Sequence, residues 1–275
     1  MSQRATSTAD SVRIIPCGAM RCDITWMLLA PGRAMRSRKN RQDPVEWTYA
    51  ASYCVLVETA RGRLLWDTGI PRDWEQRWEP MGIVDFFPYE VESEQEYFDA
   101  RMREFGLGPS DLDVVALSHL HHDHAGNVGL FGAGGTQLLC GEREWAAARG
   151  VAGACEGGYL RRDYEGLSFA TVAADEQILP GVTLLQTPGH TAGSLSLQVD
   201  LPETGTMLFT GDAVFLRESF GPPVVPPVTI GDRDAYYASI QKLRDIATAR
   251  SALVVFGHDA RQIAHLTAAT GGYFR

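Results

Sequence analysis

The sequence predicts an α/β protein in which two β-sheets face each other and helices cover their outer sides. The 275 residues are 45% hydrophobic and 21% charged, which is ordinary for a globular chain long enough to bury a full core. A weak internal repeat is the second indication. A strand hairpin ends in Asp67 and a later strand ends in His119, and the same order recurs at Asp212 and His258. We therefore expect one domain over residues 1–275.

The strands and helices follow from short local patterns. The buried run at 53–57 turns at 60–62 and returns at 64–66, which predicts a hairpin. Ser93 and Glu96 form a capping-box pattern, so we expect a helix from there to Gly106. Apolar runs predict further strands, and apolar periodicity predicts further helices. The strands are 113–117, 137–140, 182–186, 194–199, 207–210 and 253–256, and the helices are 142–149 and one that begins near 233.

The N-terminal region and the overall charge exclude several classes of partner. Residues 1–12 are small and polar, and we expect a flexible tail there. No apolar run has the length of a membrane span, and a net charge of −9 argues against a nucleic-acid-binding surface. The five cysteines include no Cys-x-x-Cys pair, which favours reduced thiols and a cytoplasmic location. The basic cluster at 33–41 is either a solvated loop or an anion or subunit contact, and residues 20–50 are a candidate homodimer contact.

The seven histidines are the main functional signal. None occurs before residue 119, and four lie within 119–124. The remaining three are His190, His258 and His265. Isolated core histidines would not cluster in this way. We expect His265, which has no such neighbours, to be a surface or packing residue.

The cluster at 119–124 has the spacing of a metal site. The predicted strand that ends at Ser118 opens into a tight turn, so His119 and His121 can converge on one ion. Asp123 and His124 can then face a second ion. Imidazole and carboxylate ligands together suit Zn²⁺, Fe, Mn or Co, and no cysteine belongs to the set.

Each ion needs a further ligand from elsewhere in the chain. His190 and His258 both lie just past a predicted strand, and a glycine precedes each of them. Asp212 also follows a strand, and its carboxylate is able to bridge two cations. We therefore expect five imidazoles and two carboxylates around two divalent metal ions, zinc being the first choice.

These residues give the chain a recognisable family resemblance. The His119-x-His121-x-Asp123-His124 motif, followed by the three later ligands, resembles the dinuclear metallo-β-lactamase superfamily. Within it, the chain is similar to the N-acyl-homoserine lactonases that quench quorum sensing. The resemblance extends from about residue 50 to 262, and four motifs carry it: 118–126, 187–190, 211–213 and 256–259.

The resemblance implies an αββα sandwich with the metals at one edge. It implies that three histidines hold one ion, that one aspartate and two histidines hold the other, and that a further aspartate bridges them. The three groups are His119, His121 and His190; Asp123, His124 and His258; and Asp212. Asp67 would orient the ligand loop.

The resemblance also implies a reaction. A metal-bridging hydroxide would attack the carbonyl of a lactone ring, and the metals would stabilise the oxyanion and the departing alkoxide. Asp123 and Asp212 are the catalytic candidates for moving the proton. The expected enzyme is a metal-dependent hydrolase of ester bonds, and its expected partner is a small lactone or ester.

Two residues depart from the relatives in the expected substrate pocket. The related lactonases usually carry a tyrosine three residues after the bridging aspartate, where this chain has Phe215. Position 122 is often aromatic in the relatives and is His122 here, which we consider as a substitute hydrogen-bond donor. Trp74 and Phe87 belong to an aromatic segment that either forms a wall for an acyl chain or packs into the core.

Other activities stay open at this stage. A hydrolase of the same fold could act on another lactone, an aryl ester, a phosphotriester or a thioester. A two-iron redox protein and a non-catalytic binding module are alternatives of a different class. The intact set of seven ligand candidates argues against the binding module.

Overall fold

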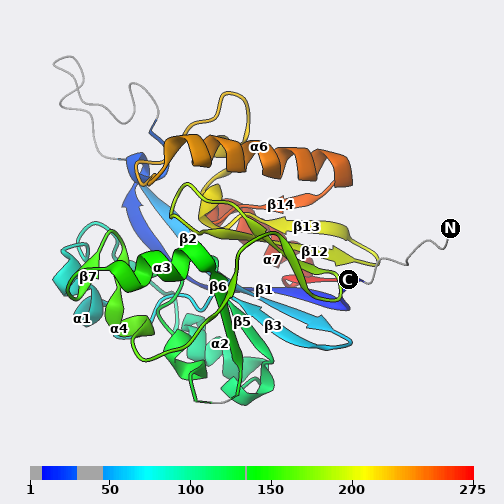
Figure 1. The fold of residues 1–275 in the computed structure, drawn as a ribbon, viewed down its shortest axis with the longest axis horizontal. Helices are drawn as coiled ribbons and strands as arrows, with labels where there is room; N and C mark the ends of the chain where they lie inside the picture. Colours follow the sequence, from blue (N-terminus) through cyan, green and yellow to red (C-terminus); the bar gives the residue numbers. More distant parts are fainter. Residues whose placement is uncertain (1–7, 30–45, 134) are drawn as a thin grey trace.

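The computed structural model describes residues 8–29, 46–133 and 135–275. The predicted two-sheet α/β architecture is confirmed: helix α6, one sheet, the other sheet and helix α2 follow one another as layers (Figure 1). The basic cluster at 33–41, predicted as a loop or contact patch, lies outside the described residues. Within the described ranges, no helix is long and apolar enough to cross a membrane.

The larger sheet has the strand order β15-β1-β2-β3-β5-β6-β9, and β4 pairs with β1. Its strands are antiparallel from β15 to β3 and parallel from β3 to β9. The bounds are β1 (Ser11–Asp23), β2 (Trp47–Thr59), β3 (Gly62–Trp66), β4 (Tyr89–Glu90), β5 (Val114–Ala116), β6 (Gln137–Gly141), β9 (Ala170–Val172) and β15 (Tyr273–Phe274).

The smaller sheet has the order β10-β11-β12-β13-β14, in which only the last pair, β13 and β14, is parallel. A separate hairpin is formed by β7 and β8. The bounds are β10 (Glu176–Leu179), β11 (Val182–Gln186), β12 (Leu195–Leu201), β13 (Gly205–Phe209), β14 (Leu253–Val255), β7 (Cys155–Glu156) and β8 (Tyr159–Leu160).

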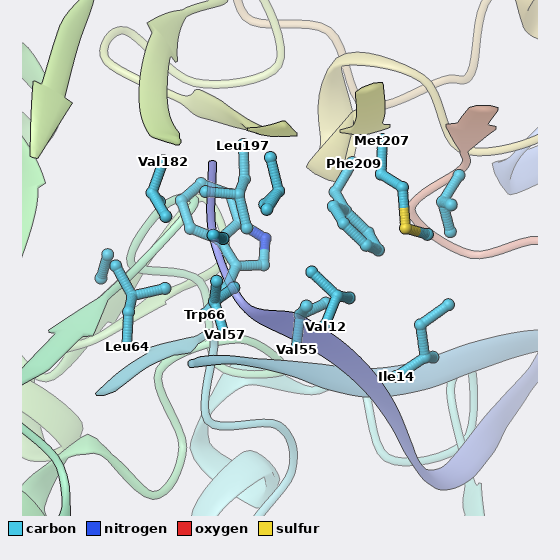
Figure 2. Packing of buried hydrophobic residues seen from close by; sticks show 14 of the residues in the cluster. Val12, Ile14, Val55, Val57, Leu64, Trp66, Val182, Leu197, Met207 and Phe209 are labelled. Carbon is cyan, nitrogen blue, oxygen red and sulfur yellow. The ribbon is translucent and has the colours of Figure 1, made fainter. Parts of the chain in front are cut away.

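The main core lies between the two sheets. Successive residues of a strand point to opposite faces, so Val55 and Val57 of β2 enter the core between the sheets. Cys54 and Leu56 enter a second core under the helices. Figure 2 shows side chains of β1, β2 and β3 facing those of β11, β12 and β13 across the gap. Because both faces are buried, these strands are continuous apolar runs in the sequence.

The helices cover the outer faces and close one side. The longest, α6, begins where the Asp232 carboxylate accepts a hydrogen bond from the Ala235 N–H, and it ends at Ser251 in the left-handed conformation. The helices are α1 (Trp74–Trp78), α2 (Phe98–Glu104), α3 (Glu142–Gly150), α4 (Arg161–Tyr164), α5 (Arg217–Phe220), α6 (Arg233–Arg250) and α7 (Ala260–Thr270). Short 3-10 helices include η3 (Glu94–Glu96), η5 (Val128–Phe131) and η6 (Gly211–Ala213).

Two expectations from the sequence are wrong in part. The predicted helix from Ser93 is divided, because Ser93 makes no side-chain cap and Tyr97 is extended between η3 and α2. The predicted tail at 1–12 is wrong for its last residues, and residues 1–7 lie outside the described ranges. Ala9 is buried and donates its N–H to Asp200, and β1 has already begun at residue 11.

Candidate metal centre

The strand ends of both sheets meet at one edge, as the internal repeat predicts. In the larger sheet β3 and β5 are parallel neighbours, and Asp67 and His119 follow them closely. In the smaller sheet β13 and β14 are parallel neighbours, and Asp212 and His258 follow them closely. The turn after β5 and the loop after β11 add the remaining candidates. The fold therefore brings together candidate ligands that are up to 139 positions apart in the chain, from His119 to His258, and adds Asp67 from further upstream.

All seven predicted ligands gather at this edge. Three overlapping sets have ligand atoms that lie within 4.8 Å of one another, which is close enough to share a cation. The sets are His119, His121 and His190; His119, His124 and Asp212; and Asp123, His124 and His258.

The two carboxylate oxygens of Asp212 face different parts of the cluster. Oδ2 lies 3.2 Å from His190 Nε2 and 3.6 Å from His119 Nε2. Oδ1 lies 3.1 Å from His258 Nε2 and 3.3 Å from His124 Nε2. This is the arrangement that a bridging carboxylate requires, with one oxygen for each half of the site.

The outer ring nitrogens are fixed by hydrogen bonds to the fold. His258 Nδ1 lies 2.9 Å from the Ala51 carbonyl oxygen, and His190 Nδ1 lies 2.8 Å from that of Thr229. A carbonyl oxygen only accepts, so both Nδ1 atoms carry the proton. The Nε2 atoms of these two rings consequently point to the cluster, where a metal would bind them.

Asp67 holds the turn that carries four of the histidines. Its carboxylate accepts from the Ser118 N–H at 2.7 Å and from the Ser118 hydroxyl at 2.9 Å. Oδ2 also lies 2.9 Å from His124 Nδ1. The residue has a left-handed φ of 59°, a strained conformation for a non-glycine residue. Its position agrees with the expected orienting role.

The electrostatics of the cluster suit a cation. Burial raises the pKa of Asp212, but the neighbouring His258, His124 and His119 outweigh it and hold that pKa well below its usual value. Burial and the neighbouring imidazoles lower the pKa of His119 well below the usual range. His119 Nε2 and His121 Nε2 are buried without a hydrogen-bond partner in the described chain. Buried polar atoms normally have partners, so this donor set fits divalent metal ions.

The cluster opens into a cavity of about 620 Å³. Its polar side chains include the candidate ligands His121, Asp123, His190, Asp212 and His258. Its other walls are mainly apolar, and they include Met20, Trp26, Met27, Met81, Ile83 and Phe87.

Three of the four predicted pocket residues line the cavity, and one does not. Phe87, His122 and Phe215 line the cavity. The Phe215 ring lies between two candidate ligands, 5.4 Å from the His190 ring and 5.1 Å from the His258 ring. Trp74 is a correction: it is buried against Trp78, with ring centroids 5.3 Å apart, and is not among the residues that line the cavity. It belongs instead to the apolar cluster that also contains the cavity-lining Met20 and Met27.

The expected donor role of His122 stays a prediction, and the hydrogen bonding of the ring favours another role. Its Nδ1 lies 3.0 Å from the Gly158 carbonyl oxygen and therefore carries the proton. Burial lowers the pKa of His122, so the ring is neutral near pH 7 and its Nε2 has a lone pair. The Trp78 ring fixes the imidazole from the side at 4.5 Å. In this state Nε2 is a hydrogen-bond acceptor.

Sequence reasoning missed two residues next to the candidate ligands. Tyr159 of β8 contacts the His121 ring at 4.8 Å, and Glu144 of α3 is a fully buried carboxylate. Neither belongs to a recognisable motif, because each reaches the site only through folding. His265, by contrast, is exposed on α7, as expected, and belongs to none of the candidate ligand sets.

Comparison with known proteins agrees with this geometry. The family model of the Metallo-beta-lactamase superfamily matches residues 47–258. This chain belongs to the metallo-beta-lactamase superfamily. N-acyl homoserine lactonase AiiB of Agrobacterium fabrum is 32% identical to it over 237 residues, which cover 80% of this chain and 83% of that protein. An N-acyl homoserine lactonase of Bacillus cereus is 31% identical over 219 residues, which cover 76% of this chain and 82% of that protein.

Solved structures show the same superfamily fold. One is an N-acyl homoserine lactone hydrolase with the product N-hexanoyl-L-homoserine bound at its catalytic metal center. It matches with a TM-score of 0.79 at 27% identity, covering 94% of this chain and 96% of that chain. The predicted fold and the predicted enzyme class are confirmed: the chain is a metal-dependent hydrolase with a His/Asp cluster for divalent metal ions.

Proposed function

We propose that this enzyme opens the ring of N-acyl-homoserine lactones and so quenches quorum sensing. The observation that carries the proposal is the seven-residue His/Asp cluster at the base of an apolar cavity. The relatives named as N-acyl homoserine lactonases support the substrate class. The cavity volume of about 620 Å³ is in the range of sites that bind small molecules.

The proposed metal ligands form two groups that share one residue. His119, His121 and His190 would hold one divalent cation, and Asp123, His124 and His258 would hold the other, with Asp212 between them. When bound, two such cations supply a hydroxide nucleophile at neutral pH and polarise a carbonyl oxygen. Zinc is our first choice among the metals that imidazole and carboxylate ligands suit, which also include Fe, Mn and Co.

The carboxylates of the cluster are the proposed proton carriers. Asp123 and Asp212 both line the cavity, where a substrate ester would lie. Burial raises the pKa of Asp123, but His124, His122 and His258 outweigh it and keep that pKa below the usual value. Both carboxylates are therefore ionised near pH 7. Each can accept a proton at an Oδ atom from the attacking water and return it to the ring oxygen that leaves.

The lining of the cavity favours a neutral substrate with an apolar chain. No lysine or arginine is among the described residues that line it. Glu156 of the β7–β8 hairpin adds a negative charge instead. A substrate with a carboxylate or a phosphodiester would lack a cationic side-chain partner here and would approach an acidic wall. An N-acyl lactone carries no charge, and its acyl chain can contact the apolar side.

Two side chains are proposed to select within this class. His122 Nε2 is a candidate acceptor for the amide N–H of an N-acyl substrate, because Nδ1 is already engaged with Gly158. Phe215 cannot donate a hydrogen bond to the carbonyl oxygen. The lack of a donor at Phe215 favours one alternative, in which the same site hydrolyses another lactone, an aryl ester, a phosphotriester or a thioester.

The proposed setting of the enzyme is a reducing compartment, the cytoplasm. All five cysteines are free thiols, and four of them are buried. A free thiol persists most readily where disulfides are kept reduced. A homodimer through residues 20–50 stays a prediction.

A panel of substrates tests the proposal. The metal-loaded enzyme is mixed with N-acyl-homoserine lactones, simple γ- and δ-lactones, an aryl ester and a phosphotriester, and acid release is followed. The Asp212→Asn variant is the control. The proposal predicts that homoserine lactones are the best substrates and that the variant is inactive. Activity confined to the aryl ester or the phosphotriester would establish the alternative instead.

A further inference from the structure

Glu144 is a buried carboxylate outside the candidate ligand set. It is the third residue of α3, and its exposed fraction is 0%. A carboxylate loses its hydration on burial, which is costly unless donors replace the water. The hydrogen-bond donors to Glu144 in the described chain are two backbone N–H groups and one hydroxyl, all of them neutral. Burying such a carboxylate lowers the stability of the core, so we examined what its hydrogen bonds hold in place.

The two oxygens of Glu144 bind two separate loops. Oε1 accepts from the Leu120 N–H at 2.9 Å, and Leu120 lies between His119 and His121. Oε2 accepts from the Thr191 hydroxyl at 2.6 Å and from the Gly193 N–H at 3.3 Å, just after His190. One carboxylate therefore joins the loops that carry all three histidines of the first candidate site.

The contact between the second loop and α3 is close and specific. A Cβ on Gly193 would lie only 2.0 Å from the backbone nitrogen of Glu144, so the loop backbone rests directly on the first turn of the helix. The positive end of the helix dipole stabilises a negative charge at this position. The Tyr159 ring contacts that of His121, with ring centroids 4.8 Å apart.

We propose that Glu144 is a positioning residue that fixes the distance between His121 and His190 and thereby sets the metal affinity of the three-histidine site. His121 Nδ1 and His190 Nε2 are 3.1 Å apart, although they come from loops that are 69 residues apart in sequence. In the described chain, Glu144 is bonded to residues directly next to His119, His121 and His190, whereas Asp123 and His124 lie further along the first turn and His258 lies in another loop. The inference rests on the proposed metal ligation and is independent of the proposed substrate.

The chemistry of the contact requires a carboxylate. Donors approach both oxygens, and a glutamine has only one acceptor oxygen. The NH₂ group of a glutamine at this position would face either the Leu120 N–H or the donors of the second loop, and it could not accept a hydrogen bond from them. Glu144→Gln therefore keeps the size of the side chain and breaks the link to one loop. Outer hydrogen-bond partners of metal ligands typically contribute about 10–100-fold in metal affinity.

Metal titration of the metal-free protein tests the inference, with calorimetry for affinity and Co²⁺ absorption for the ligand environment. Glu142→Gln is the matched control, because Glu142 is an exposed residue of the same helix turn. We expect the wild type and Glu142→Gln to bind two ions alike. In Glu144→Gln, one ion keeps its affinity and the other binds about 10–100-fold more weakly. Equal weakening of both ions, or no weakening, would overturn the inference.

A second pair of variants covers the case in which Glu144→Gln does not fold. Thr191→Val removes one hydroxyl donor to Glu144, whereas Thr191→Ser keeps it. The inference predicts weaker binding of one ion in the valine variant and recovery in the serine variant. Identical affinities in the two would overturn it. A wild-type protein that binds no metal would overturn the proposed function itself, whereas normal metal binding in every variant would overturn only the role of Glu144.

Discussion

The turn between β7 and β8 offers a test of how tightly His121 is held. Gly157 and Gly158 both have a positive φ, 58° and 97°. A Cβ on Gly157 would meet no atom within 4 Å. A Cβ on Gly158 would lie 2.9–3.0 Å from three atoms of the His121 ring. Alanine at these two neighbouring positions therefore introduces similar backbone strain but pushes on His121 from only one of them.

The magnitudes follow from these distances. A left-handed alanine costs about 1–2 kcal/mol, and Gly158→Ala costs somewhat more because its φ lies further from the favoured region. To regain an ordinary 3.4 Å contact, the His121 ring must withdraw by about 0.5 Å from a Cβ at 2.9 Å. A misplacement of about 1 Å can cost about 10²-fold in rate, so we expect about a tenfold loss of kcat/KM.

Urea unfolding and metal titration separate the two effects. Both variants should lose stability, but only Gly158→Ala should bind one of its two metal ions more weakly and hydrolyse its substrate more slowly. Gly157→Ala should keep the metal affinity of the wild type. Equal metal affinities in the two variants would refute the conclusion that the turn positions His121.

Four further changes have defined outcomes. Burial raises the pKa of Asp163 to about 7 despite its 2.9 Å contact with Arg77. Between about pH 4 and pH 7 the folded chain therefore keeps a proton on Asp163 that the unfolded chain has lost. This group makes the free energy of unfolding fall as the pH rises through that range, by at most about 4 kcal/mol. Asp163→Asn should flatten urea stability measured across that range, and an unchanged slope would contradict the assignment. Removing the metals with a chelator should lower the Tm by about 8–16 °C for each ion that was present at about 1,000 times its Kd, as calorimetry would show. His122→Phe should raise KM about fivefold for an N-acyl lactone by removing a hydrogen bond of about 1 kcal/mol, and leave a γ-lactone without an amide unchanged. Asp212→Asn should lose more than about 100-fold in kcat/KM, because an amide offers only one acceptor oxygen to the two halves of the site, and a metal count should show the loss of at least one ion.

The local part of the site is predictable from the sequence. The histidines at 119–124 lie in one turn, and Asp212 and His258 follow apolar strands, so residue type and strand position together identify the candidates. The paired hairpins were predictable because strands buried on both faces form continuous apolar runs. The candidate ligands follow the ends of such strands, so the pairing of the strands brings the seven residues together.

The rest depends on contacts between distant segments. β1 was missed because its register with β2 shifts between Pro16 and Ala19, and its polar residues hide the strand pattern. Glu144 resembles any acidic residue in the first turn of a helix until the loop at Gly193 covers it. Trp74 and Phe87 belong to the same aromatic segment, and only the fold decides that one is in the core and the other at the cavity.

We propose that a two-metal cluster in this chain opens an N-acyl-homoserine lactone. The most direct measurement titrates the metal-free enzyme with zinc and follows the conversion of N-hexanoyl-homoserine lactone to the ring-opened acid by mass spectrometry. We expect the rate to rise until about two equivalents are bound, and we expect no such rise for Asp212→Asn. An intact lactone ring at every metal loading, or a full rate with a single ion, would contradict it.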